Sequence, residues 1–333
     1  MRFVSDNVLA FITLILSSFL ILRSSEVAKD QERTPPKIDL ERVVERTENK
    51  STQVLLTGDV MLGRNVMAKS LDLKDHFYPF RKVSEVLKHA DITFINLENP
   101  IVSGCARHTD GFTFCTTPEI AKGIEESGID VVSLANNHTQ NYSQNGLNET
   151  LSFLEGKGIL VTGVGELVTK EVEGTKFGFL GFDKAEVVYP KLTQTESNLI
   201  KDSASKVDVL IIAMHWGVEY QSIALPGIKE LAAQLVSLGA DIIVGHHPHW
   251  VQDIECFNET GSEYSEFSRN KNGCPADSKV VYYSLGNFIF DQMWSEETRK
   301  GMVVRLTFEK NRVIKEDLIN TSIRNAGQPE VVN

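Results

Sequence analysis

The sequence predicts a mixed α/β protein, and two recurring features carry that prediction. Four segments each combine an amphipathic helical pattern, an Asp and a run of β-branched and other apolar residues: 80–99, 119–138, 196–216 and 227–250. Near-continuous apolar runs that alternate with helical periodicity are typical of strands buried on both faces of a sheet. We therefore expect helices to alternate with buried strands through most of the chain.

The predicted elements follow one another in a regular order. A strand at 52–62 opens the domain without a preceding helix, and the four helix-strand units follow it. After residue 275 the pattern changes to strand segments at 278–292 and 300–318. We expect these to be antiparallel, the second turning at the sequence EKNR. The folded domain is predicted to span 51–325, with a loose tail at 326–333.

The N-terminus has the features of an export segment. Arg2 precedes an apolar run at 8–22, and charged residues follow it. This run is short for a bilayer span of about 20 residues but suits a signal anchor or a signal peptide. We expect residues 1–23 to be an uncleaved anchor that makes the membrane a partner, with the domain extracytoplasmic, or secreted if the segment is cleaved. Residues 24–50 are predicted to be a charged linker.

Composition limits the class of partner. The chain has 333 residues with 41% hydrophobic content, enough to fill a core. Its 45 acidic and 34 basic residues give a formal net charge of -11. Phosphate-backbone binding needs a basic footprint, so nucleic acid is excluded as an expected partner.

The four cysteines lie in two local pairs. Cys105 and Cys115 flank one polar loop, and Cys256 and Cys274 flank another. Neither pair has the C-x2-4-C spacing of a zinc knuckle, which is the rival interpretation. Two loop-closing disulfides in an oxidising compartment are therefore expected, although four cysteines permit three pairings.

Residues able to bind a metal follow each of the five predicted strands. They are Asp59, Glu98, Asn137 with His138, His215, and the group His246, His247 and His249. In open α/β sheets the loops at the carboxyl ends of the strands gather on one edge. Imidazole, carboxylate and amide oxygen together suit Mn, Zn or Fe, whereas calcium prefers an oxygen-only shell. The sequence therefore predicts a site for one or two divalent ions.

Six short motifs, in this order, resemble those of a known family: LLTGDVMLGR, INLENP, SLANNHTQNY, AMHWGVEY, VGHHPHWVQ and YSLGNFIFDQ. The resemblance covers roughly residues 52–292. The family is that of bacterial capsule synthesis proteins, the CapA and PgsA proteins of poly-γ-glutamate capsule systems, within the calcineurin-like metallophosphoesterase superfamily. It implies a four-layer α-β-β-α sandwich of metallophosphoesterase type.

The resemblance also implies a ligand set. One ion would take Glu98, Asn137, His215 and His247, and the other would take Asp59, Glu98 and His249. The superfamily's first motif is Asp-x-His, but Met61 stands here at the position of that histidine. Glu98 stands where a bridging Asp is usual, and the spacing leaves His246 as a further candidate. A single ion is therefore an alternative to two.

Further residues receive roles from the same comparison. Two ions about 3.5 to 4 Å apart would activate a hydroxide for attack on a phosphoester. His138 is then the expected general acid, and Arg64 is a candidate contact to an anionic substrate. Asn287 ends a strand segment and is expected to orient a ligand.

These features lead to two hypotheses on function. The first is a metal-dependent hydrolase in capsule or cell-surface polymer biosynthesis, acting on an anionic polymer or a phosphoester substrate. An amide bond of poly-γ-glutamate is an alternative substrate, because a metal-activated hydroxide also attacks carbonyls. The second is a non-catalytic scaffold or polymer-binding subunit, which would associate with other capsule synthase subunits.

Overall fold

Two β-sheets form the centre of the protein. The computed structural model describes residues 51–258, 262, 273–275 and 277–332. The larger sheet has the order β14-β13-β12-β1-β2-β3-β4, and β11 pairs with β1. Its strands are β1 (Thr52–Val60), β2 (Ile92–Leu97), β3 (Val131–Ser133), β4 (Leu160–Thr162), β11 (Asn287–Ile289), β12 (Lys300–Glu309), β13 (Arg312–Arg324) and β14 (Gln328–Val331).

The smaller sheet has six strands in the order β5-β6-β7-β8-β10-β9. They are β5 (Val168–Val172), β6 (Thr175–Ala185), β7 (Val209–Gly217), β8 (Ile242–His246), β9 (Ile254–Phe257) and β10 (Lys279–Tyr282). The helices are α3 (Arg64–Leu73), α4 (Ser84–Lys88), α5 (Pro118–Glu126), α6 (Ser143–Glu155), α7 (Gln194–Ala204) and α8 (Pro226–Ser237), with a short 3-10 turn at Glu297–Arg299.

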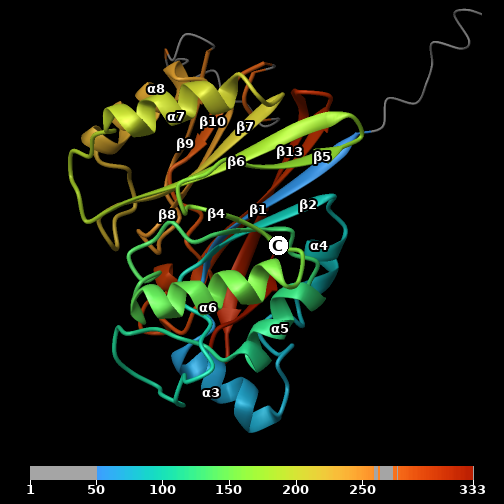
Figure 1. The fold of residues 1–333 in the computed structure, drawn as a ribbon, viewed down its shortest axis with the longest axis vertical. Helices are drawn as coiled ribbons and strands as arrows, with labels where there is room; N and C mark the ends of the chain where they lie inside the picture. The colour runs from blue at the N-terminus through green and yellow to red at the C-terminus, as the bar shows by residue number, and fades with distance from the viewer. Residues whose placement is uncertain (1–50, 259–261, 263–272, 276, 333) are drawn as a thin grey trace, which may run out of the picture. The chain divides into compact units, whose positions relative to one another are not determined.

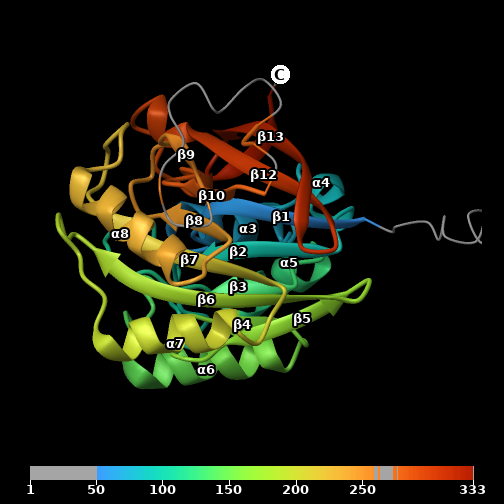
Figure 2. The same ribbon diagram turned by 90° about the horizontal axis from the view of Figure 1, so that it is seen from above.

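Helices cover the outer face of each sheet (Figures 1 and 2). Side chains of α4, α5 and α6 pack on the larger sheet around Leu55, Ile95 and Val132. Helices α7 and α8 pack on the smaller sheet in a separate apolar cluster. A third cluster, which includes Phe94 and Phe179, lies between the sheets. The prediction of a mixed α/β protein with two packed sheets is therefore confirmed.

The recurring Asp before each predicted strand has a structural reason. Each one accepts a hydrogen bond from a backbone N–H at the start of the neighbouring strand. The pairs are Asp91 with Gln53 at 2.7 Å, Asp130 with Thr93 at 2.8 Å, Asp208 with Lys176 at 2.8 Å, and Asp241 with Leu210 at 2.7 Å. Each carboxylate accepts from a backbone N–H group that the β-ladder leaves without a partner at the start of the strand. The four Asp residues therefore help to determine which strands are neighbours.

Helix starts carry recognisable signals. The Thr117 side chain caps α5, and Pro118 occupies its first position, where no intrahelical donor is required. Helix α7 begins with a capping box, in which Thr193 and Glu196 each bond the other's backbone N–H.

The C-terminal third differs from the sequence prediction in two respects. Segment 278–292 was expected to be antiparallel. Strand β10 does pair antiparallel with β9, but it also runs parallel to β8, and β11 runs parallel to β1. The tail from residue 326 is not loose, because β14 pairs with β13. The expected hairpin at EKNR does form between β12 and β13. Local sequence patterns do not encode which distant strand becomes a neighbour, and this explains the differences.

Both predicted disulfides are present in the structure. Cys105 is bonded to Cys115, and Cys256 is bonded to Cys274. Among the described residues, no helix has the length and apolarity needed to cross a membrane. The predicted anchor at 1–23 and the linker at 24–50 lie outside the described residues, so they remain predictions.

Candidate metal centre

The five predicted strand ends meet at one place. Strands β1, β2 and β3 are parallel neighbours in the larger sheet, and β7 and β8 are parallel neighbours in the smaller one. Registers align Asp59 with Asn96 and His215 with His246. The carboxyl ends of strands from both sheets therefore supply the site.

Two glycines allow the strands to come this close. A Cβ added to Gly58 would lie 2.0 Å from the carbonyl oxygen of Gly286. A Cβ added to Gly245 would lie 2.0 Å from the carbonyl oxygen of Tyr283. Any side chain at either position would push neighbouring backbone apart just before the residues that form the site.

Asp59 is fully buried and accepts three hydrogen bonds. Its Oδ1 accepts from Nδ2 of Asn96 at 2.8 Å. Its Oδ2 accepts from the backbone N–H of His247 at 3.2 Å and from Nδ1 of His249 at 3.1 Å. Burial opposes ionisation of Asp59, but the hydrogen bond from His249 and the nearby imidazoles outweigh it and hold the pKa of Asp59 well below its usual range. Asp59 is therefore an ionised carboxylate at neutral pH.

Glu98 is buried to the same extent but lacks hydrogen-bond partners. Neither carboxylate oxygen has one among the described residues. Its Oε1 lies 3.8 Å from Nε2 of His138 and 3.8 Å from Nε2 of His249. Burial raises the pKa of Glu98 well above its usual range. An unpaired buried carboxylate costs free energy unless a cation or a donor compensates it.

His249 presents one nitrogen to the site. Its Nδ1 donates to Asp59 and, at 2.9 Å, to Oδ1 of Asn287. Asn287 is held in turn, since its Nδ2 donates to Gln292 and to the carbonyl of Thr298. Nδ1 therefore carries a proton, and Nε2 is the atom left for a ligand. Burial lowers the pKa of His249, but the Glu98, Asp59 and Glu219 carboxylates outweigh this and raise it to about 9.

His215 and His247 lie beside each other, with ring centroids 4.8 Å apart. Nε2 of His215 is 3.1 Å from Oδ1 of Asn137. Nε2 of His247 is 2.9 Å from Oε1 of Glu186, and its buried Nδ1 has no described partner. Burial lowers the pKa of both imidazoles. They are therefore neutral, which is the form that binds a metal.

His246 lies apart from these ligand atoms. Its Nε2 is 3.0 Å from the carbonyl oxygen of Thr57 on β1, and its ring packs against Phe94. His246 therefore links β8 of the smaller sheet to β1 of the larger sheet. His247 and His249 reach the site from the loop that follows β8. Both of these residues have positive φ, 94° and 58°, so the backbone turns sharply between them.

His138 is held on two sides. Its Nδ1 lies 3.1 Å from Oδ1 of Asn141, which also accepts the backbone N–H of Phe114 at 2.7 Å. Its ring stacks on Phe114 with centroids 4.1 Å apart. Because Nδ1 faces an acceptor, it carries the proton of the neutral ring, and Nε2 is the nitrogen that faces Glu98 at 3.8 Å. Burial lowers the pKa of His138.

Arg64 is occupied by contacts within the protein. Its guanidinium pairs with Asp291, donates to the carbonyl of Gly111 at 3.2 Å and lies over the ring of Phe114 at 4.7 Å. The predicted bidentate contact to a substrate would therefore require the ion pair with Asp291 to open.

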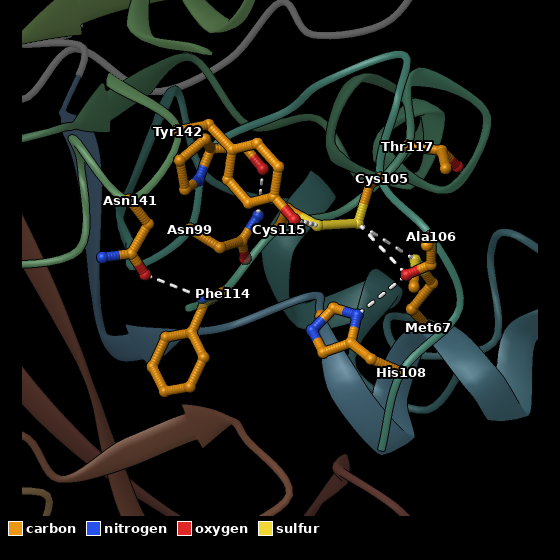
Figure 3. Close-up of a disulfide and its surroundings, with 12 residues drawn as sticks. Met67, Asn99, Cys105, Ala106, His108, Phe114, Cys115, Thr117, Asn141 and Tyr142 are labelled. Carbon is orange, nitrogen blue, oxygen red and sulfur yellow. Dashed lines mark hydrogen bonds between the residues drawn. A yellow bond between two sulfur atoms is a disulfide. The ribbon is translucent and has the colours of Figure 1, made fainter. Parts of the chain in front are cut away.

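The loop that carries Phe114 is closed by a disulfide (Figure 3). Cys115 follows Phe114 directly and is bonded to Cys105. The Cys105–His108–Cys115 group has metal-ligand spacing, but its thiols are consumed in the disulfide. The hydroxyl of Tyr142 lies 3.1 Å from the Cys115 sulfur. The disulfide therefore supports the ring on which His138 stacks.

Three residues near the site were missed by the sequence interpretation. Glu186 and Glu219 form a group of possible ligands with His247. Asn96 donates to Asp59 and lies 3.4 Å from Nδ1 of His215. Glu186 directly follows β6, a strand that the sequence analysis did not predict. Its place at the end of a strand is the signal that could have identified it. Glu219 lies inside the quoted AMHWGVEY motif.

A cavity of about 720 Å³ opens beside Asn137. Its polar lining comes mainly from amide and acidic side chains, including Gln140, Gln144, Glu166 and Asp183. No Lys or Arg is among its lining residues. The site therefore has room for part of a substrate, but the cavity itself offers no basic side chain to an anion.

The residues present fit a divalent cation. Asp59, Glu98 and His249 each offer an atom, and these atoms lie within 4.8 Å of one another. The unpaired oxygens of buried Glu98 are the feature that a cation would explain directly. Mixed nitrogen and oxygen donors favour Mn, Zn or Fe.

The chain is similar to bacterial capsule synthesis proteins. Residues 53–292 match the family model described as bacterial capsule synthesis protein PGA_cap. The capsule biosynthesis protein CapA of Bacillus anthracis is 28% identical over 315 residues, which cover 87% of this chain and 71% of the relative. The PGA biosynthesis protein CapA of Bacillus subtilis (strain 168) is 28% identical, covering 76% of this chain and 67% of the relative.

Among solved structures, a novel phosphatase from Mycoplasma pneumoniae matches 81% of this chain and 93% of its own, with 15% identity and a TM-score of 0.46. The family match extends over most of the described domain. The chain belongs to the bacterial capsule synthesis protein family PGA_cap.

Proposed function

We propose that the protein is an exported, membrane-tethered, metal-dependent hydrolase of capsule or cell-surface polymer biosynthesis, with a sandwich of metallophosphoesterase type. Its relatives are named as capsule or PGA biosynthesis proteins, which supports the biological role. The apolar run at 8–22 and the two disulfides support export and tethering.

The observation that carries the proposal is the environment of Glu98. Its carboxylate is buried, unpaired and within 3.8 Å of imidazole nitrogens from two different loops. A structural residue in this position would be paired, because burial of an unpaired carboxylate is costly. A site built for a cation accounts for both the burial and the lack of partners.

Two neighbouring groups of residues would hold the ion. Glu98, His249 and Asp59 form one group, and His215, Asn137 and His247 lie next to it. When bound, a divalent cation supplies Lewis acidity and lowers the pKa of water. Asn287 fixes the tautomer of His249 and so keeps Nε2 available.

The remaining residues would act on the substrate. His138 directs Nε2 into the site and would exchange a proton with a leaving oxygen. The cavity beside Asn137 would accommodate the part of the polymer substrate next to the bond that is cleaved. Because its lining lacks Lys and Arg, the negative charge of an anionic polymer would have to be met at the ion or outside this cavity.

The test is hydrolysis by the full-length protein in the presence of Mn²⁺. Bis(p-nitrophenyl) phosphate and poly-γ-glutamate are supplied as alternative substrates, so that phosphoester and amide cleavage are distinguished. We expect cleavage of one substrate, a loss of at least about 100-fold in Glu98→Ala, and full activity in the exposed control Glu171→Gln. Equal residual rates in all three proteins would refute a hydrolase that uses this site.

One observation favours a second candidate, the non-catalytic scaffold. Met61 is fully buried in an apolar cluster with Phe114, Phe290 and Ile323, and its sulfur accepts the backbone N–H of Gly63 at 3.0 Å. It therefore offers no ligand to an ion next to Asp59. A protein that binds one ion and anionic polymer but cleaves neither substrate would be this scaffold.

A further inference from the structure

We propose that Glu219 is a ligand of the cation held by Glu98 and His249. It would supply a ligand atom where Met61, in the loop after β1, offers none. The inference rests on the proposed metal site and adds to it a carboxylate from the loop after β7.

Asp59, Glu98 and His249 alone are too few for a complete coordination shell. Asp59 accepts three hydrogen bonds, so much of its acceptor capacity is used within the protein. Each of the three residues offers one ligand atom: an oxygen of Asp59, an oxygen of Glu98 and Nε2 of His249. Zinc takes at least four ligands, and Mn prefers more. Met61, two residues after Asp59, is packed among apolar side chains and adds nothing.

Glu219 lies close to one of these atoms, Nε2 of His249. Its Oε1 is 3.7 Å from Nε2 of His249, which is itself 3.8 Å from Oε1 of Glu98. Two donors that each lie about 2.1 Å from one ion at tetrahedral angles are about 3.4 Å apart. Each of the two carboxylates is therefore within a few tenths of an ångström of the separation from Nε2 of His249 that two ligands of one ion would have.

Burial and charge support the same position. The Glu98 side chain, 1% exposed and without a partner, faces the nitrogen that Glu219 approaches. Glu98, Asp59 and Glu219 surround the single imidazole of His249 with three carboxylates. This excess of negative charge in a buried position is what a divalent cation would compensate.

The backbone holds Glu219 in place while leaving it accessible. The N–H of the next residue, Tyr220, donates to the carbonyl of Pro248 at 2.9 Å. This hydrogen bond holds the loop after β7 against Pro248, the residue between His247 and His249. The Glu219 side chain is 35% exposed, so an ion from solvent can reach it without opening of the core. Glu219 also belongs to the group with Glu186 and His247, and so lies between the two sets of ligands.

The test measures Mn²⁺ binding to the full-length protein by equilibrium dialysis, independently of any activity. We expect Glu219→Gln to weaken binding by at least about 10- to 100-fold, the loss usual even for outer partners of metal ligands. The matched control Glu171→Gln, at an exposed position on β5, should bind as the parent does.

A third variant separates the two proposals. If the parent binds Mn²⁺ and Glu98→Ala abolishes binding while Glu219→Gln does not change it, the role of Glu219 is wrong and the metal site stands. If the parent binds no ion, or Glu98→Ala binds as well as the parent, the proposed metal site itself is wrong. Circular dichroism spectra that match the parent show that each variant is folded.

Discussion

Removal of the disulfide between Cys105 and Cys115 should affect both stability and the position of His138. The two cysteines are separated by 10 residues. In the loop-closure relation this length corresponds to about 2.7 kcal/mol of unfolding free energy at 25 °C. For a domain of this size such a loss lowers the melting temperature by roughly 5 to 10 °C. The variant is Cys105→Ala/Cys115→Ala, measured by thermal unfolding.

The second disulfide offers a matched control. Cys256 and Cys274 are separated by 18 residues, which corresponds to about 3.2 kcal/mol. Through the registers of β9, β10 and β8, Cys256 lies level with Ile242, at the end of β8 opposite to the histidines. Cys256→Ala/Cys274→Ala should therefore cost similar stability and leave the site unchanged.

His138 distinguishes the two variants. Phe114 precedes Cys115 and stacks on His138 with centroids 4.1 Å apart, so its ring current shifts the His138 ring protons. These resonances should move only in the Cys105→Ala/Cys115→Ala variant, with His138→Gln used for assignment. Equal melting temperatures for parent and variant would refute the stability argument. Free thiols in the exported, non-reduced parent would show that the disulfides, and the oxidising compartment inferred from them, are wrong.

Three further predictions concern residues around the site and one helix. Gly245→Ala should lower the unfolding free energy by about 3 kcal/mol or more in urea titrations, because its Cβ would lie 2.0 Å from a carbonyl oxygen; a loss under about 1 kcal/mol would contradict this. His246→Ala should lower stability by about 2 kcal/mol and keep the parent's metal content, since its nitrogen bonds a backbone carbonyl; loss of the ion would make it a ligand. Burial opposes ionisation of Glu196, but Lys184 and the capping box outweigh it and lower its pKa. Glu196→Ala should therefore cost about 1 kcal/mol at pH 7, and the difference should disappear as the pH falls well below 4.5; a difference independent of pH would contradict it.

The sequence was informative about local elements and about which residues face the site. Apolar runs after an Asp predicted β2, β3, β7 and β8, and the apolar run at 52–62 predicted β1, because burial on both faces leaves a clear composition signal. Strands β4 and β5 escaped detection, since one is very short and the other is half-exposed. The antiparallel pairing of β10 with β9 agrees with the prediction, but the parallel partners of β10 and β11 were missed because they are set by contacts far apart in the sequence.

The residues of the candidate site were likewise predicted only in part. Asp59, Glu98, His215 and His249 could be proposed because they end predicted strands. The different environments of His246, His247 and His249 could not be predicted, since they depend on two positive φ angles within one loop. Glu219 was missed because its approach to His249 depends on how the loop after β7 folds back onto Pro248.

The metal content of the full-length protein tests the central claim most directly. The protein would be dialysed against Mn²⁺, Zn²⁺ or Fe²⁺, freed of unbound ions, and analysed for metal per chain together with Glu98→Ala. At least one ion per parent chain, absent from a folded Glu98→Ala variant, is the predicted result. A folded parent that retains no ion, or a variant that retains as much as the parent, would contradict the assignment of this site to a metal.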